Sequence, residues 1–223
     1  MIAIGVVAHV KRETMAKELA STVEADFPPF VDDGTLGCST NHRRVWAHLA
    51  AAGSEWGLAL EDDAVPVPGF RDQLHQALAA SPCDVVSLYL GSGRPIWFEM
   101  AGRGSAQKLQ PLIRQAVDTA HAEDASFILA PKLFHAVAVA IRTPLIPSML
   151  SSVQRSPKPI DFAIGDWCVA EGHTVAYTSP SLVDHDDTET VIPKHPDGEP
   201  RREPRKAHHV GTRTTWTSRS VDI

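Results

Sequence analysis

The sequence predicts an α/β fold in which helices flank a mainly parallel sheet and an extended tail follows. Short apolar runs of strand length, such as residues 2–8 and 57–60, alternate with segments whose apolar residues repeat every three to four positions. Strands that are apolar on both faces are typical of buried parallel sheets. Short stretches rich in Pro and Gly, typical of turns, separate these segments. Strand and helix alternating along a chain indicate a parallel sheet.

The elements follow one another without a domain-sized linker or a repeat. The expected strands are residues 2–8, 30–31, 57–60, 85–90, 125–129 and 175–177. The expected helices run from Met15 to Val23, from a Ser39 cap to Ala50, from Phe70 to Leu78, from Pro131 to Ile141 and from Ile160 to Glu171. Residues 91–124 are expected to be loop-rich, and Pro144 and Pro147 to break the chain into turns.

Composition favours one domain over residues 1–192 and a basic, Pro-rich tail over residues 193–223. The 223 residues are 43% hydrophobic, which is ample for a core. Residues 194–223 hold seven Lys and Arg against four acids, although the whole chain carries a net charge of −6. The tail shows no helical or strand period. An acidic body excludes a general nucleic-acid coat, whereas the tail leaves room for a local anionic contact.

The sequence shows no recognisable targeting signal and no C-x-x-C motif, so we expect a cytoplasmic protein without a membrane span. No apolar run approaches the ~20 residues that a membrane helix needs. The start, residues 1–4, lacks the basic residues and the cleavage site of a signal peptide. Cys38, Cys83 and Cys168 never form C-x-x-C, so they are expected to be reduced, mostly buried thiols rather than disulfides or a zinc knuckle.

Three adjacent carboxylates, Glu61, Asp62 and Asp63, follow the apolar strand 57–60 directly. Burying one ionised carboxylate without a partner costs several kcal/mol, so the strand has reached either solvent or a cation. Ligands of open α/β sheets bind beyond the carboxyl ends of the strands. Glu61 and Asp63 are expected to project the same way, an arrangement that suits Mg2+ or Mn2+ carrying phosphate oxygens. A solvated acidic turn is the alternative.

Other candidate residues lie elsewhere in the chain. His42 and Arg43 stand near a helix start, where exposed amides favour an anion, although a polar histidine packed at the helix edge is the alternative for His42. A second apolar stretch runs into acids around His185, and the helix 160–171 carries Asp161 and Asp166.

Together these segments resemble nucleotide-sugar glycosyltransferases of the GT-A fold, which is Rossmann-like, and most closely the family 25-like enzymes. The matching segments are Leu36–His42 with Trp46, Leu60–Ala64 and Pro180–His185, within a resemblance that covers about residues 1–187. The chain departs from the bacterial pattern in being shorter and in having Asn41 where serine is usual. It also looks like small glycosyltransferases of actinobacterial phages, partly through residues 210–217; a phage-encoded protein would act in the host cytoplasm.

The resemblance implies a nucleotide-diphosphate-sugar donor, most simply a UDP-sugar, and Mn2+ or Mg2+. Glu61-Asp62-Asp63 matches the family's DxD-type motif, with Asp63 as a direct metal ligand, Glu61 on the metal shell or the ribose, and His185 closing the metal site. The implied donor and cofactor contacts are Ala8, His9, Asp33, His42, Arg43, Glu61 and Asp62. The dication would neutralise the leaving diphosphate.

The resemblance also places a general base on the helix 160–171. Asp166 falls at the matching position, and Asp161, five residues earlier, is the alternative. Such a carboxylate would remove the proton of the acceptor hydroxyl. A retaining mechanism would leave that role to the leaving phosphate instead.

Acceptor and reaction class stay open at the level of sequence. A protein or a glycan ranks ahead of a hydroxymethylated DNA base, because the acidic body would repel DNA even though the basic tail suits it. A nucleotidyltransferase would bring a glycine-rich phosphate loop after the first strand, which residues 8–12 lack. A non-catalytic nucleotide-sugar-binding module or a structural phage protein on the same fold is the remaining alternative.

Overall fold

The computed structural model describes residues 1–93, 103–188, 191 and 205–223. Within them the chain forms an eight-stranded sheet in the order β10-β6-β8-β5-β7-β3-β1-β2, and a separate pair of short strands. The large sheet contains β1 (Ile2–His9), β2 (Phe30–Asp32), β3 (Trp56–Glu61), β5 (Val85–Ser87), β6 (Phe127–Ala130), β7 (Ala138–Arg142), β8 (Val175–Thr178) and β10 (Ser220–Asp222). The pair is β4 (Ala64–Pro66) with β9 (Val183–His185).

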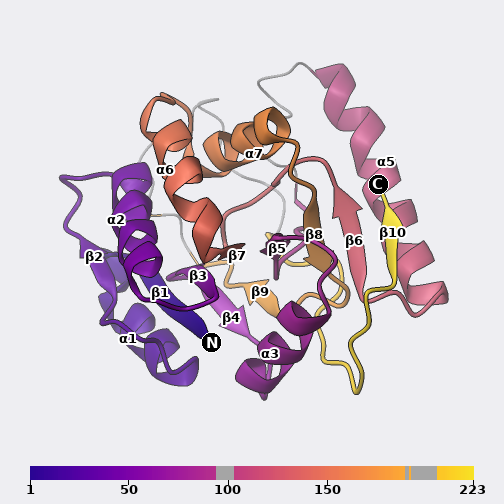
Figure 1. The fold of residues 1–223 in the computed structure, drawn as a ribbon, viewed down its shortest axis with the longest axis horizontal. Coiled ribbons are helices and arrows are strands. Elements are labelled where there is room, and N and C mark those ends of the chain that lie inside the picture. The colour runs from indigo at the N-terminus through magenta and orange to yellow at the C-terminus, as the bar shows by residue number, and fades with distance from the viewer. Residues whose placement is uncertain (94–102, 189–190, 192–204) are drawn as a thin grey trace.

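Helices flank both faces of this sheet (Figure 1). They are α1 (Glu13–Thr22), α2 (Cys38–Ala51), α3 (Phe70–Ala80), α5 (Arg103–Ala122), α6 (Ile146–Gln154) and α7 (Ile160–Glu171), with short 3-10 turns η1 (Val10–Arg12) and η2 (Thr143–Leu145). In β1, Ala3 and Val7 pack in one core with α2, α5, α6 and α7, whereas Ile4 and Val6 pack in another with α1 and α3. Because successive side chains of a strand point to opposite faces, the two cores lie on opposite sides of the sheet.

The predicted fold class is confirmed. Parallel pairs join β1 to β2 and β3, β5 to β8, and β6 to β10. Antiparallel pairs join β7 to β3 and β5, and β6 to β8. The protein is therefore an α/β domain with a mostly parallel mixed sheet flanked by helices. The antiparallel strand β7 separates β3 from β5, a position that a regular alternation of strand and helix does not predict.

The helix predicted over residues 131–141 is wrong, because this segment contains β7 instead. Its residues 138–141 are buried on both faces of the sheet, and a short, uniformly apolar run has no period that separates a strand from a helix. The turns expected around Pro147 are also replaced by α6, in which the proline occupies the first turn. Proline is tolerated there since its missing amide has no helical partner in any case.

The loops expected over residues 91–124 are replaced, from Arg103 onward, by the twenty-residue helix α5. Its inward side carries Ile113, Ala116 and Ala120, a spacing of three and four residues that marks a helical face. Residues 94–102, where Arg94, Pro95, Trp97 and Phe98 are also expected in loops, lie outside the described residues. No helix in the described ranges, α5 included, is long and apolar enough to cross a membrane.

Two further boundaries differ from the sequence prediction. The strand predicted over residues 85–90 ends at Ser87 in β5, although Leu88 to Leu90 stay buried. β8 is not the last strand, because β9 and β10 follow it. The other predicted elements are present, including α7, which ends before Gly172 in a left-handed conformation as expected.

The described part of the tail, residues 205–223, is extended and packs on the domain. β10 adds to the sheet edge beside β6, and Ala207 and Val210 form single bridges to Gly91 and Ser181. Trp216 is buried among residues of the second core, and its Nε1 donates to Gln73 Oε1 at 3.0 Å. The proposed domain boundary at residue 193 falls outside the described residues.

We expect Trp216→Phe to lower the free energy of unfolding by about 1–2 kcal/mol. The substitution removes one hydrogen bond and part of a buried ring. Gln73 Oε1 also accepts from the amide of Arg213 at 2.9 Å, so it is not left unpaired. Urea unfolding measures the change, and Leu112→Ala, at an exposed position on α5, should stay within about 0.5 kcal/mol of the parent. Equal stability of both variants would mean that the indole of Trp216 and its hydrogen bond add nothing to the fold.

Candidate active site

The carboxyl ends of β1, β2 and β3 form one edge of the sheet. These strands are parallel, and their register places Asp32 beside His9 and Glu61 beside Val7. Ligands of such sheets bind beyond this edge. The first turns of α2 and α7 reach the same place, since Asp161 interacts electrostatically with Glu61 and His42.

The cation that the buried acids require is the guanidinium of Arg12. Its Nη1 donates to Asp62 Oδ1 at 3.1 Å and also to Asp63 Oδ2, while the amide of His9 donates to Asp62 Oδ2 at 2.8 Å. All three charged residues are buried, between 5% and 7% exposed. The acidic stretch is therefore neither a solvated turn nor a set of unpaired carboxylates.

Asp63 and His185, two of the three expected metal ligands, are neighbours. Pairing of β4 with β9 places Ala64 beside His185, and His185 Nε2 lies 3.3 Å from Asp63 Oδ2. Burial raises the pKa of Asp63, but His185 and Arg12 outweigh it and hold that pKa below its ordinary value. The other carboxylate oxygen, Asp63 Oδ1, is buried and has no hydrogen-bond partner among the described residues.

Glu61, the third expected ligand, faces another partner. The strand ends at Glu61 and the chain turns at Asp62 and Asp63, so the structure differs from the expectation that Glu61 and Asp63 project the same way. Glu61 Oε1 lies 3.0 Å from His42 Nε2 on α2. Asp63, His185 and Glu61 thus do not fit one metal ion in this arrangement, and a dication at Asp63 Oδ2 would have to displace the guanidinium already bonded there.

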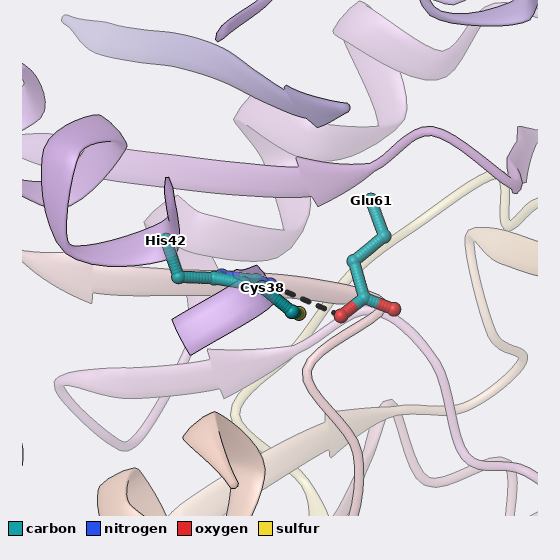
Figure 2. A group of neighbouring side chains, drawn as sticks. All are labelled: Cys38, His42 and Glu61. Atoms are coloured by element: carbon teal, nitrogen blue, oxygen red, sulfur yellow. Dashed lines mark hydrogen bonds and ion pairs between the residues drawn. The ribbon is translucent and has the colours of Figure 1, made fainter. Parts of the chain in front are cut away.

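Cys38, His42 and Glu61 converge instead (Figure 2). One potential ligand atom from each lies within 4.8 Å of the other two. His42 is 1% exposed; burial lowers its pKa, but the Cys38 sulfur and the Glu61 carboxylate outweigh burial and raise it to about 10. Its Nδ1 has no hydrogen-bond partner among the described residues. His42 is therefore packed, as the alternative interpretation expected, and its role in binding an anion stays a prediction.

Cys38 is the residue of this group that the sequence reasoning missed. The expectation of buried thiols holds for Cys168, whereas Cys38 is exposed and Cys83 is partly buried. The spacing of Cys38 and His42 in the sequence could have indicated this pair, because residues four apart on a helix share a face. Cys38 and His42 have that spacing on α2.

Asp32 fixes the loop that leads into α2. Its carboxylate accepts from the amides of Gly34, Leu36 and Gly37 at 2.9–3.0 Å. Burial raises the pKa of Asp32, but these three hydrogen bonds outweigh it and lower that pKa. Asp33, an expected donor contact, is exposed and accepts from the amide and the hydroxyl of Thr35. Asp32, which is buried, therefore fixes the conformation of the loop at this edge of the sheet.

The start of α2 differs from the sequence prediction by two positions. The N-cap residue is Gly37, with φ of 80°, rather than Ser39. A glycine reaches this positive φ without strain. The loop held by Asp32 delivers the chain in that conformation, so the helix begins at Cys38 and carries its thiol to the edge of the sheet.

Three further expected donor contacts lie at or near the same edge. The carbonyl of Ala8 accepts from Asn41 Nδ2 at 3.1 Å. His9 ends β1, and its Nδ1 accepts from the amide of Lys11. Arg43 Nη2 donates to Thr40 Oγ1 at 2.9 Å within α2. All three residues therefore make contacts within the protein itself.

The two candidate bases lie in different environments. Asp166 Oδ1 accepts from Lys132 Nζ at 2.8 Å and its other oxygen pairs with Lys158, so that burial, which raises its pKa, is outweighed and the pKa is lowered. Burial and the nearby Glu61 carboxylate raise the pKa of Asp161 to about 6. Of these two carboxylates, Asp161 is the one that combines proximity to Glu61 and His42 with a pKa suited to proton transfer near neutrality.

Asp161→Asn is expected to stabilise the protein by about 2–3 kcal/mol at pH 7 and hardly at all near pH 3.5. A carboxyl whose folded pKa is raised from 3.8 to about 6 favours folding less as pH rises through that interval. Asn carries no charge, so the free-energy cost of burying an ionised carboxylate at this position disappears. Urea unfolding at both pH values checks the difference, and an equal effect at the two pH values would contradict it.

An open hollow of about 250 Å³ adjoins Asp62 and Asp63 between α1 and β4. Its other acidic lining residues are Glu18 and Asp186. Four acids make this hollow unfavourable for an anionic ligand and suitable for a cation or for sugar hydroxyls, which donate to carboxylates.

A comparison of the chain with protein-family models finds no match, and a comparison with curated proteins finds none either.

Proposed function

We propose that this protein is a glycosyltransferase that moves a sugar from a nucleotide-diphosphate donor, most simply a UDP-sugar, to a hydroxyl acceptor. The observation that carries the proposal is the convergence of Glu61, the paired Asp62 and Asp63, and Asp161 at the carboxyl edge of β1–β3. Ligand sites of α/β sheets lie at this edge. The motif resemblance to GT-A enzymes supports the same class.

In this proposal the residues of the edge have separate roles. Glu61 accepts hydrogen bonds from the ribose of the donor, and the start of α2 with Arg43 faces its phosphates. Asp161 takes the proton of the acceptor hydroxyl, since with a pKa of about 6 it is mostly ionised at neutral pH. A divalent cation, when bound, would supply neutralisation of the leaving diphosphate. The requirement for Mn2+ or Mg2+ remains a prediction from the resemblance.

The surface charges favour a protein or glycan acceptor over DNA. In the described tail, four basic residues each pair with an acid of the domain: Arg205 with Asp187, Lys206 with Asp184, Arg213 with Asp124 and Arg219 with Glu123. Their charge is therefore largely compensated within the protein. The acidic hollow beside Asp62 and Asp63 would also repel a phosphate backbone.

Release of nucleoside diphosphate tests the proposal. The purified protein is incubated with UDP-, GDP- and dTDP-sugars, with and without Mn2+, and with pools of protein, glycan and hydroxymethylated DNA. We expect one donor to give nucleoside diphosphate together with a labelled acceptor. Thermal stabilisation by a donor without release would indicate a binding module. Pyrophosphate release from a nucleoside triphosphate and a sugar phosphate would indicate a nucleotidyltransferase instead.

A further inference from the structure

The cluster of Cys38, His42 and Glu61 combines three kinds of metal ligand at one point (Figure 2). A thiol, an imidazole and a carboxylate converge from α2 and from the end of β3. Among the described residues, no other group of three or more His, Cys, Asp and Glu side chains meets the same 4.8 Å condition. We propose that Cys38, His42 and Glu61 bind a divalent cation of borderline softness, with Zn2+ as the best fit.

The spacing of the three side chains is close to that of a zinc site. With metal–ligand distances of about 2.0–2.3 Å, tetrahedral ligands stand roughly 3.3–3.8 Å apart. His42 Nε2 and Glu61 Oε1 are 3.0 Å apart, and the Cys38 ligand atom lies within 4.8 Å of both partners. Side-chain movements of about 1 Å would therefore bring all three within bonding distance of one ion.

The backbone around the cluster is held in place before any ion binds. Asp32 secures the loop before Cys38 through three amides, and Asn41 Nδ2 ties α2 to the carbonyls of Ala8 and Phe30. Such support is what orients ligands in protein metal sites. The exposed Cys38 and the 26% exposed side chain of Glu61 leave a route by which an ion can reach the cluster.

Charge and ligand type select the ion. Metal ligands bind in their deprotonated forms, so binding would release protons from His42 and Cys38. The thiolate and the carboxylate then carry two negative charges, which a dication would neutralise at this partly buried place. Thiolate and imidazole ligands favour Zn2+ or Co2+ over Mg2+, which prefers oxygen. The expected Mn2+ or Mg2+ set of Asp63, His185 and Glu61 shares only Glu61 with this site, and its Asp63 carboxylate already pairs with Arg12. The proposal goes beyond the glycosyltransferase function and does not depend on it.

Metal binding itself tests the proposal, on the full chain after removal of metal with a chelator. Co2+ is titrated while the thiolate-to-cobalt charge-transfer absorption is followed, and Zn2+ competition then gives its affinity. We expect one ion per chain with a thiolate band. Cys38→Ser should abolish the band and weaken Zn2+ binding at least about 10-fold. Glu61→Gln should weaken binding while retaining the band.

Matched variants separate this site from the alternatives. Cys83→Ser changes the other accessible thiol and should leave both band and affinity unchanged. Asp63→Asn should also leave them unchanged. The proposal is overturned if the wild type binds no Co2+ or Zn2+, or if Asp63→Asn loses the ion while Cys38→Ser keeps it. Thermal unfolding of the metal-free variants checks that each is folded, and none of these readouts requires sugar transfer.

Discussion

Asp161→Asn is expected to lower the rate of sugar transfer about 10²–10⁴-fold while leaving the affinity for the donor unchanged. A positioned general base contributes about this factor, and Asn cannot accept the proton. Asp161 interacts electrostatically with Glu61 and His42, so its carboxylate is near the proposed donor site. The Asp161 pKa of about 6 suits a general base. Steady-state kinetics with a saturating donor and calorimetry of donor binding measure the two quantities.

Asp166→Asn is the matched control on the same helix. Lys132 and Lys158 bind the Asp166 carboxylate, which makes it a weak proton acceptor, so its loss should change the turnover number by less than about 10-fold. The rate of the wild type should rise with pH through about 6, and this step should be absent in Asp161→Asn. If Asp166→Asn instead showed the large kinetic loss, the base would be the residue that the sequence match indicated first.

The sequence predicted the elements that have a clear period or a clear boundary. β1 and β3 are apolar runs with distinct ends, and α7 combines a helical pattern with a terminal glycine, so local chemistry is enough to place them. β7 was missed because it is a short run buried on both faces. Its role as an antiparallel strand between β3 and β5 depends on tertiary pairing rather than on its own sequence.

The candidate site was predictable as a location but not as a set of contacts. The acids after β3 marked the correct sheet edge. Which cation they face depends on η1, where Arg12, far from them in sequence, folds back onto Asp62 and Asp63. The same limit applies to Cys38, because its meeting with Glu61 depends on how α2 lies against β3.

Arg12→Met is expected to lower the free energy of unfolding by about 3–5 kcal/mol at pH 7. Removing one partner of a buried ion pair leaves uncompensated charge, and here two buried carboxylates lose their shared cation. Met fills a similar volume without charge. Urea unfolding measures the loss, and Lys11→Met, at the exposed neighbouring position, should stay within about 0.5 kcal/mol of the parent.

The pH dependence and a double substitution identify the cause of that loss. In the wild type the pKa of Asp63 is lowered, so its contribution to stability is present above the unfolded pKa and is lost as pH falls through the folded pKa. The gap between wild type and Arg12→Met should therefore narrow in acid, where the carboxylates are protonated. Adding Asp63→Asn to Arg12→Met should restore part of the stability at pH 7.

Addition of Mn2+ then tests whether the cation at Asp62 and Asp63 is the guanidinium of Arg12 or a metal ion that can take its place. If Arg12 occupies a place that a dication can take, Mn2+ should raise the melting temperature of Arg12→Met and leave that of the wild type nearly unchanged. Only the variant lacks the guanidinium that pairs with both Asp62 and Asp63. Stabilisation of the wild type by Mn2+, lost in Asp63→Asn, would show that the ion displaces the guanidinium. The role of Asp63 as a metal ligand, which the resemblance implies, would then be correct despite the contact with Arg12.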